Sequence, residues 1–257
     1  MLTVSNLSYS INGKQILSNI SETFEANKIN LIIGPNGAGK STFIKAICGE
    51  LKLSNPTMVQ YENSISLKKT TELAKIRAVL SQNIEVNFPL SVKEIVMMGR
   101  YPHFMNFPSK KDETACEEAL SFFDLKGFEN REFHTLSGGE KQRVHFARVL
   151  TQIWYPIENQ TRYLILDEPL TFLDVHYQYD FMYKIQEIAT QKNIVIIGVL
   201  HDLNVTAKFA DKIMILKNGK IIASGTPDAV LTEKNILEAY QMHPKIFTID
   251  SHRFISF

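Results

Sequence analysis

Hydrophobic and polar positions alternate along residues 2–24, and the alternation is interrupted at Asn12-Gly13. A period of two is typical of a half-buried β-strand, and an Asn-Gly pair between two such runs favours a hairpin turn. The start of the chain therefore predicts an antiparallel β layer.

Beyond this hairpin the apolar residues form continuous runs instead of alternating. Strand candidates lie at 29–34, 76–82, 162–168, 194–201 and 212–225, and helical stretches separate most of them. Continuous apolar strands between helices predict an α/β fold, with a parallel sheet covered on both faces.

Residues 91–135 contain no strand-like run. The stretch "SVKEIVMMGR" begins with Ser91, which can cap a helix, and "SKKDETACEEALSFFDL" is amphipathic. This pattern predicts a helical subdomain inserted in the sheet order. Further on, a polar segment with Pro156, Asn159 and Gln160 is typical of a surface loop.

Composition narrows the class of protein. The 257 residues are 44% hydrophobic, and 28 Lys+Arg against 27 Asp+Glu give a net charge of +1, so a basic nucleic-acid face is not expected. The N-terminus lacks the basic start and apolar segment of a secretion signal, and runs such as 194–200 are too short to cross a bilayer. We expect a cytosolic chain that does not span a membrane, with Cys48 and Cys116 as ordinary core or helix residues.

A glycine-rich stretch follows the apolar run "INLII". It reads "GPNGAGKST" and fits the pattern G-x-x-x-x-G-K-[ST]. Glycines let backbone N–H groups surround phosphates, and a following helix offers its positive end. The lysine would reach the β and γ phosphates, and the serine would ligate Mg²⁺. The predicted nucleotide-binding residues are Gly34, Pro35, Asn36, Gly37, Ala38, Gly39, Lys40, Ser41 and Thr42; a mere glycine-rich turn is the alternative.

Two adjacent carboxylates end the apolar strand "YLILDE". Ligands bind at the carboxyl ends of strands in open α/β sheets, which places Asp167 and Glu168 beside the phosphate loop. Asp167 is suited to hold Mg²⁺ through water, and Glu168 to polarise the water that attacks the γ-phosphate. Without the phosphate loop, the pair would be typical of solvated strand ends.

A second helix start lies in "LSGGEKQR". Ser137 can cap the helix, Gly138 and Gly139 leave backbone N–H groups exposed, and Glu140 follows them. One nucleotide could contact both helix starts only if the fold brought them together, or if two copies faced each other. An ordinary capped helix is the alternative.

With these motifs the sequence resembles, over nearly its whole length, the ATP-binding subunits of ABC transporters. The resemblance implies a homodimer that holds ATP and Mg²⁺ between the two motifs. It also implies that Gln82 senses the γ-phosphate and Mg²⁺, that His201 contacts the γ-phosphate, and that Asp174 lies in a loop crossing the dimer interface. Tyr9 is the candidate to stack on adenine, with Ile11 as the alternative register. Phe172 is bulkier than the small residues usual in the crossing loop.

The resemblance also implies a division of the chain. We expect a single ABC ATPase domain over 1–257. Its parts are a β subdomain and the first part of the nucleotide-binding core in 1–86, a helical subdomain in 87–160 that contains the signature stretch "LSGGEKQR", and the second part of the core in 161–257.

Several stretches resemble the metal-chelate group of importers, including "FPLSVKEIVMMGRYPH" and "LDVHYQ". The implied cargo is hemin, with ferric siderophore or cobalamin as the alternatives. The rival classes of protein are a non-transport ABC ATPase and a P-loop GTPase. The implied setting is the cytoplasmic face of the inner membrane, with two permease subunits and, through them, a substrate-binding protein, and without contact to nucleic acid or cargo. His103 and His176 are accordingly expected to be surface or packing residues and not haem ligands. Met97-Met98 is interpreted either as part of a groove for a membrane subunit or as a core-facing stripe.

Overall fold

The computed structural model describes residues 1–62, 70–81, 88–171, 173–191, 193–249 and 252–257. The chain opens with an antiparallel sheet in the order β2-β1-β4, formed by β1 (Leu2–Ile11), β2 (Lys14–Phe24) and β4 (Val59–Tyr61). Ile11 lies opposite Lys14, so Asn12-Gly13 forms the turn and the predicted hairpin is confirmed.

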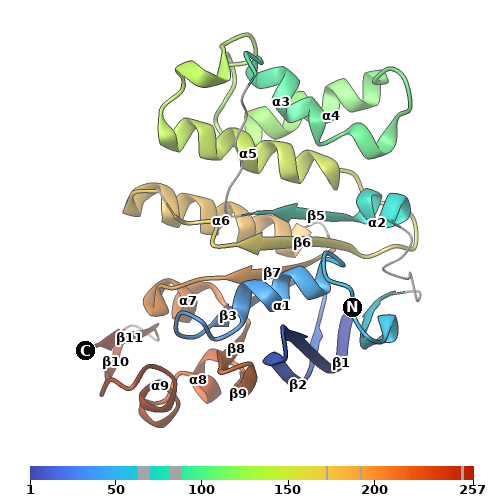
Figure 1. The fold of residues 1–257 in the computed structure, drawn as a ribbon. Coiled ribbons are helices and arrows are strands. Elements are labelled where there is room, and N and C mark those ends of the chain that lie inside the picture. Colours follow the sequence, from blue (N-terminus) through green and yellow to red (C-terminus); the bar gives the residue numbers. More distant parts are fainter. Residues whose placement is uncertain (63–69, 82–87, 172, 192, 250–251) are drawn as a thin grey trace.

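A six-stranded sheet in the order β5-β6-β7-β3-β8-β9 forms the centre of the fold (Figure 1). Its strands are β3 (Lys28–Ile33), β5 (Arg77–Leu80), β6 (Arg162–Asp167), β7 (Ile194–Val199), β8 (Lys212–Lys217) and β9 (Lys220–Gly225). Every residue of β6 and β7 is buried, as expected for strands covered on both faces.

One strand prediction is corrected. The run 212–225 forms two antiparallel strands, because Asn218 and Gly219 adopt positive φ angles of 48° and 74° and reverse the chain. An Asn-Gly pair is suited to this turn, since both of its central residues need positive φ. The central sheet is therefore mixed, with β9 as an antiparallel edge beside parallel strands.

Helices surround this sheet. Beside it lie α1 (Lys40–Ile47), α2 (Thr70–Ile76), α6 (Val175–Gln191), α7 (Leu203–Phe209), α8 (Pro227–Val230) and α9 (Glu233–Tyr240). A separate helical layer, at the top of Figure 1, contains α3 (Val92–Met98), α4 (Lys110–Phe122) and α5 (Gly138–Gln152). Short 3-10 turns span Pro56–Met58, Tyr101–His103 and Phe133–Thr135, and a terminal hairpin joins β10 (Lys245–Ile249) to β11 (His252–Ser256).

The helical layer begins its helices with side-chain caps. Ser91 caps α3 as predicted, and its hydroxyl and backbone amide pair with Glu94 in a capping box. Ser109 with Asp112 and Ser137 with Glu140 form the same motif at α4 and α5. Each box satisfies backbone N–H groups that a helix start leaves unpaired.

Several expectations about single residues are met. Cys48 and Cys116 are free and buried. Met97 packs against the helical core, with its Sδ 3.8 Å from the Sγ of Cys116, which favours the core-facing interpretation for this residue. The Nε2 of His103 lies 2.7 Å from the carbonyl oxygen of Gln152, and His176 is exposed, consistent with packing and surface roles.

Candidate nucleotide-binding and catalytic site

The glycine-rich loop joins a buried strand to a helix start that no side chain caps. β3 runs buried to Ile33, and α1 begins at Lys40 after Gly39, whose φ is 102°. No side-chain cap hydrogen bond forms at this described helix end, so its first backbone N–H groups are free of side-chain acceptors. Unpaired N–H groups at a helix start form a ready anion site.

Lys40 lies within this loop and is almost fully buried. Its Nζ donates to the carbonyl oxygens of Gly34 at 2.8 Å and Pro35 at 3.0 Å. Burial lowers the pKa of the ammonium group, while the charges of Glu168 and Asp167 oppose this fall. The lysine is thus held by the loop's own carbonyls and lies within the electrostatic influence of both carboxylates.

A turn far along the chain supports the loop. Gly219 donates its amide to the carbonyl oxygen of Ala38 at 2.9 Å, and its own carbonyl accepts from the amide of Ser18 at 2.8 Å. A Cβ on Gly219 would lie 2.1 Å from the carbonyl oxygen of Ile16, so only glycine fits there. The phosphate motif does not predict this support; its one sequence signal is the Asn-Gly pair in "KNGK".

Asp167 ends β6 as a buried carboxylate, 8% exposed. Burial, and secondarily the charge of Glu168, raise its pKa above the usual range. Its Oδ1 has no hydrogen-bond partner in the part of the chain that the structure describes. An unpaired buried carboxylate oxygen close to a lysine and a phosphate loop fits a Mg²⁺ site. The Ser41 hydroxyl stays a predicted second ligand.

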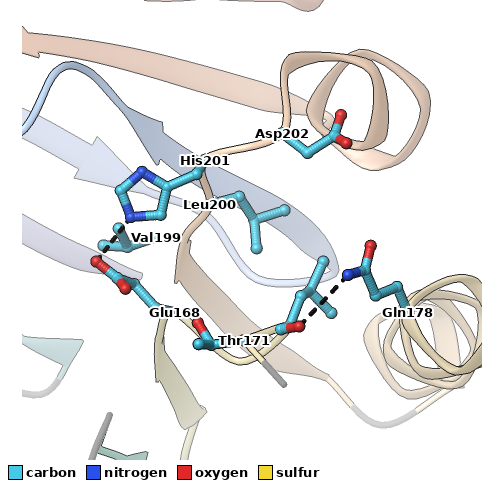
Figure 2. A pocket seen from close by; sticks show the side chains of 8 residues that line it. Glu168, Thr171, Gln178, Val199, Leu200, His201 and Asp202 are labelled. Atoms are coloured by element: carbon cyan, nitrogen blue, oxygen red, sulfur yellow. Dashed lines mark hydrogen bonds and ion pairs between the residues drawn. The ribbon is translucent and has the colours of Figure 1, made fainter. Parts of the chain in front are cut away.

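Glu168 and His201 meet at the ends of adjacent strands. Glu168 follows β6 with a φ of 53°, and His201 follows β7, the next strand in the sheet. Figure 2 shows the two side chains pointing toward each other, with the Nε2 of His201 2.8 Å from the Oε1 of Glu168. They line a pocket of about 210 Å³ that also includes Thr171 and Asp202. A carboxylate and an imidazole therefore share one open cavity.

The second helix start lies in another layer. The hydroxyl and backbone amide of Ser137 both donate to Glu140 Oε2, at 2.8 and 2.7 Å. Figure 1 draws α5 in the helical layer, whereas α1 packs near β3 and β7, with β5 and β6 between them. The two predicted phosphate-binding helix starts thus belong to different layers of one chain.

One further side chain links these layers. The Nε2 of Gln142 on α5 donates to the carbonyl oxygen of Pro169 at 3.1 Å, directly after Glu168. The motif "LSGGEKQR" contains Gln142, but its pattern does not indicate this contact. The helix that starts at Gly138 is therefore attached to the loop that carries the candidate general base.

The remaining predicted residues lie at different places. Asp174 is exposed, and its Oδ1 accepts from the amide of Tyr177 at 3.1 Å at the start of α6. Tyr9 pairs with Leu17 in the first hairpin and packs partly against its core, and Ile11 is 46% exposed. Gln82 and Phe172 lie outside the described residues. The roles given to all of these positions stay predictions.

Comparison with known proteins assigns the family. The family model of the ABC transporter matches residues 17–171, which include both the glycine-rich loop and the signature stretch. The chain belongs to this family and is an ATP-binding protein of the ABC type. Among the described residues, none of the helices combines the length and the apolar character needed to cross a bilayer.

Relatives with assigned names are similar over almost their whole length. The hemin import ATP-binding protein HmuV of Escherichia coli O157:H7 is 38% identical over 93% of this chain and 92% of its own. HmuV of Rhizobium etli is 40% identical over 93% of this chain and 90% of its own. Among solved structures, an inward-facing metal-chelate type ABC transporter shares the fold, with a TM-score of 0.82 at 22% identity over 99% of this chain and 95% of its own. CbiO1 of Clostridium perfringens, part of the ABC transporter complex cbiONQ, is 28% identical over 92% of each chain, with a TM-score of 0.77.

Proposed function

We propose that this chain is the ATP-hydrolysing subunit of an importer that takes up hemin through separate membrane permease subunits. The 38 to 40% identity to hemin import ATP-binding proteins supports the cargo. The contact of 2.8 Å between Glu168 and His201, in a pocket at the carboxyl ends of β6 and β7, supports the catalytic role. The chain would work at the cytoplasmic face of the inner membrane as a peripheral subunit.

In the proposed mechanism the residues from Gly34 to Thr42 hold the phosphates of ATP, with Lys40 turning from its backbone acceptors toward the β and γ phosphates. Glu168 accepts a proton from the attacking water, and His201 donates a hydrogen bond to the γ-phosphate. Both side chains already face one cavity, so binding the γ-phosphate there would replace their mutual contact. Bound Mg²⁺ would neutralise phosphate charge, with Ser41, Asp167 and Gln82 as the residues that hold it.

The proposed active unit is a homodimer. Ser137 to Glu140 lie at a surface helix start in a different layer from α1. A second copy placed head to tail would bring its signature stretch to the phosphates held by the first, with Asp174 near the interface. ATP binding would then close the pair, hydrolysis would reopen it, and the helical layer with Gln82 would transmit the motion to the permease subunits.

The decisive experiment separates binding from hydrolysis. Glu168→Gln keeps the size of the side chain and removes its basicity, so we expect ATP binding to persist while kcat falls about 100-fold or more. The variant should also accumulate as an ATP-bound dimer in size-exclusion chromatography with light scattering. The control is Glu158→Gln, which changes an exposed loop carboxylate and should leave kcat unchanged. Full turnover by Glu168→Gln would reject the assigned role.

The cargo needs its own experiment. The chain and its permease partners, reconstituted in liposomes with a substrate-binding protein, should hydrolyse ATP faster when that protein carries hemin. Ferric siderophore and cobalamin with their own binding proteins are the comparison arms. Stimulation by one of these and not by hemin would keep the ATPase assignment and replace the cargo.

A further inference from the structure

The side chain of Asn204, three residues after His201, hydrogen-bonds to the backbone of the C-terminal hairpin. Asn204, the second residue of α7, donates from Nδ2 to the carbonyl oxygen of Ile255 at 3.2 Å. Its Oδ1 accepts from the amide of Ile255 at 2.8 Å. Both backbone groups of a β11 residue are thus satisfied by a single side-chain amide, which pairs with the outer edge of β11 as a neighbouring strand would.

Only two residues separate Asn204 from His201, and backbone hydrogen bonds fix the chain before and after His201. Asp202 caps α7, with its Oδ1 accepting from the amides of Asn204 at 2.7 Å and Val205 at 2.9 Å. On the other side of His201, the amide of Leu200 donates to the carbonyl oxygen of Ile32 in the central sheet at 3.2 Å. A shift of the start of α7 would therefore be absorbed at His201 and change its contact with Glu168.

The hairpin itself is anchored at a second point. Arg253 lies 2.7 Å from Asp228 through Nε and donates from Nη1 to the carbonyl oxygen of Leu231 at 2.8 Å. These partners belong to α8 and its end, whereas Asn204 belongs to the helix that follows His201. Leu203 and Ile255 also share one buried cluster, so α7 and β11 stay packed when a polar contact is removed.

We propose that Asn204 is a positioning residue for ATP hydrolysis. Through Ile255, the C-terminal hairpin braces the start of α7 and sets how His201 approaches Glu168 and the γ-phosphate. This inference rests on the proposed function, because it assumes that His201 acts in hydrolysis.

A double-mutant cycle on the full chain tests the inference through steady-state ATPase kinetics. Asn204→Ala should lower kcat about tenfold with a KM for ATP within about twofold of the parent, since misplacing a reacting group by a fraction of an ångström costs rate more than binding. His201→Ala should lower kcat about 100-fold. In the double variant, kcat should stay within about twofold of His201→Ala, because two residues that act through one contact are not additive.

A matched variant separates positioning from simple loss of stability. Arg253→Ala removes the other anchor of the same hairpin and should lower the Tm by about as much as Asn204→Ala, a few degrees, while kcat stays within about twofold of the parent. Asn204→Asp keeps the acceptor for the Ile255 amide but places a carboxylate oxygen against the Ile255 carbonyl oxygen, so its kcat should fall at least as far as that of Asn204→Ala.

The outcomes distinguish this inference from the proposed function. If His201→Ala kept full activity, the proposed catalytic role would fail, and the inference with it. If His201→Ala lost activity but Asn204→Ala did not, only the inference would be overturned. Multiplicative losses in the double variant, or an equal loss of kcat in Arg253→Ala, would also overturn it.

Discussion

The two helix starts that the sequence marks for phosphate binding are built in opposite ways. At α1 the helix begins behind Gly39 without a side-chain cap, and Lys40 is 6% exposed. At α5 the helix begins at the surface, where a capping box pairs the amides of Ser137 and Glu140 with each other's side chains and does not include the amides of Gly138 and Gly139. Space around Gly139 is open, whereas a Cβ on Gly39 would lie 2.9 Å from Leu17 Cδ2 and 3.1 Å from the Ile16 carbonyl oxygen.

This difference shows what each motif needs from the rest of the molecule. The α1 site is shaped from within, by neighbouring strands and by the turn at Gly219 that supports Ala38. The α5 start is capped without a ligand, because the side chains of Ser137 and Glu140 each accept from the other's amide. Because the box leaves the amides of Gly138 and Gly139 at the surface, this helix start is suited to contact a phosphate held by another molecule.

The largest effect should come from Lys40→Ala, which removes the cation from the α1 site. We expect ATP binding to weaken at least 100-fold and hydrolysis to become undetectable, because no other described side chain in the loop supplies a positive charge to the phosphates. Binding of a fluorescent ATP analogue measures the first effect. Lys52→Ala, at an exposed lysine beyond α1, is the control and should bind normally. Retained tight binding in Lys40→Ala would contradict the assignment of this loop.

A pair of glycine substitutions should separate the two helix starts most sharply. Gly39→Ala places a side chain at a φ of 102° against Leu17 and Ile16, and should cost about 1 to 3 kcal/mol of folding free energy together with ATP binding. Gly139→Ala meets open space in a helix and should raise stability by about 0.5 to 1 kcal/mol. Thermal unfolding measures both changes.

The same pair tests the proposed dimer. Although Gly139→Ala is expected to be the more stable variant, its added methyl group would keep a partner's γ-phosphate from the exposed N–H groups. We therefore expect normal ATP binding by the monomer with ATP-dependent dimerisation and kcat both reduced about tenfold or more. Normal kcat in Gly139→Ala would mean that the α5 start is only a capped helix.

Local motifs predicted both helix starts, because their chemistry depends on neighbours in the sequence. The glycines around Lys40, the cap at Ser137 and the turn at Asn12-Gly13 each have a short-range physical cause. The apolar run at 162–168 predicted a strand, and the rule that ligands bind at the carboxyl ends of parallel strands placed Asp167 and Glu168 beside the phosphate loop. His201 was implied by the family resemblance, and its contact with Glu168 was not predicted.

The sequence motifs did not predict which distant segments these sites contact. Gly219 supports Ala38, Gln142 reaches the carbonyl oxygen of Pro169, and Asn204 pairs with Ile255, each through backbone groups that a side-chain pattern does not encode. The run 212–225 was predicted as one strand although its Asn-Gly pair marks a turn, because its apolar residues continue on both sides of that turn.

Ser137→Ala should have a smaller effect on stability than the glycine changes but a clear one on the dimer. Loss of the cap should cost about 1 kcal/mol, or about 2 to 4 °C in Tm. Ser91→Ala breaks the matching box at α3 and should lower the Tm by the same amount. Only Ser137→Ala should also weaken ATP-dependent dimerisation, measured by light scattering. An equal effect of both variants on the dimer would assign the α5 cap a purely structural role.

The smallest expected effect on stability tests whether the buried carboxylate of Asp167 destabilises the nucleotide-free protein. Burial raises the pKa of Asp167, so this carboxyl binds its proton more tightly in the folded state than in the unfolded chain. The charged carboxylate therefore destabilises the free protein at neutral pH, and the cost disappears as the pH falls through the raised pKa. Asp167→Asn should raise the Tm of the nucleotide-free protein by about 2 °C at neutral pH while abolishing hydrolysis that depends on Mg²⁺.

The pH dependence of this rise in Tm decides whether the charged Asp167 carboxylate is its cause. The difference in Tm between Asp167→Asn and the parent should shrink toward acid pH, because the parent then carries a protonated and neutral carboxyl at the same place. At α5 the direction is opposite: the Ser137 backbone and hydroxyl hydrogen bonds lower the pKa of Glu140, so its contribution is present at neutral pH and is lost as the pH falls through that lowered pKa. At neutral pH the Tm of Asp167→Asn should therefore lie above that of the parent, and the Tm of Glu140→Gln below it. Both differences should shrink toward acid pH. A lower Tm for Asp167→Asn at neutral pH would show that the carboxylate has a stabilising partner in the nucleotide-free protein.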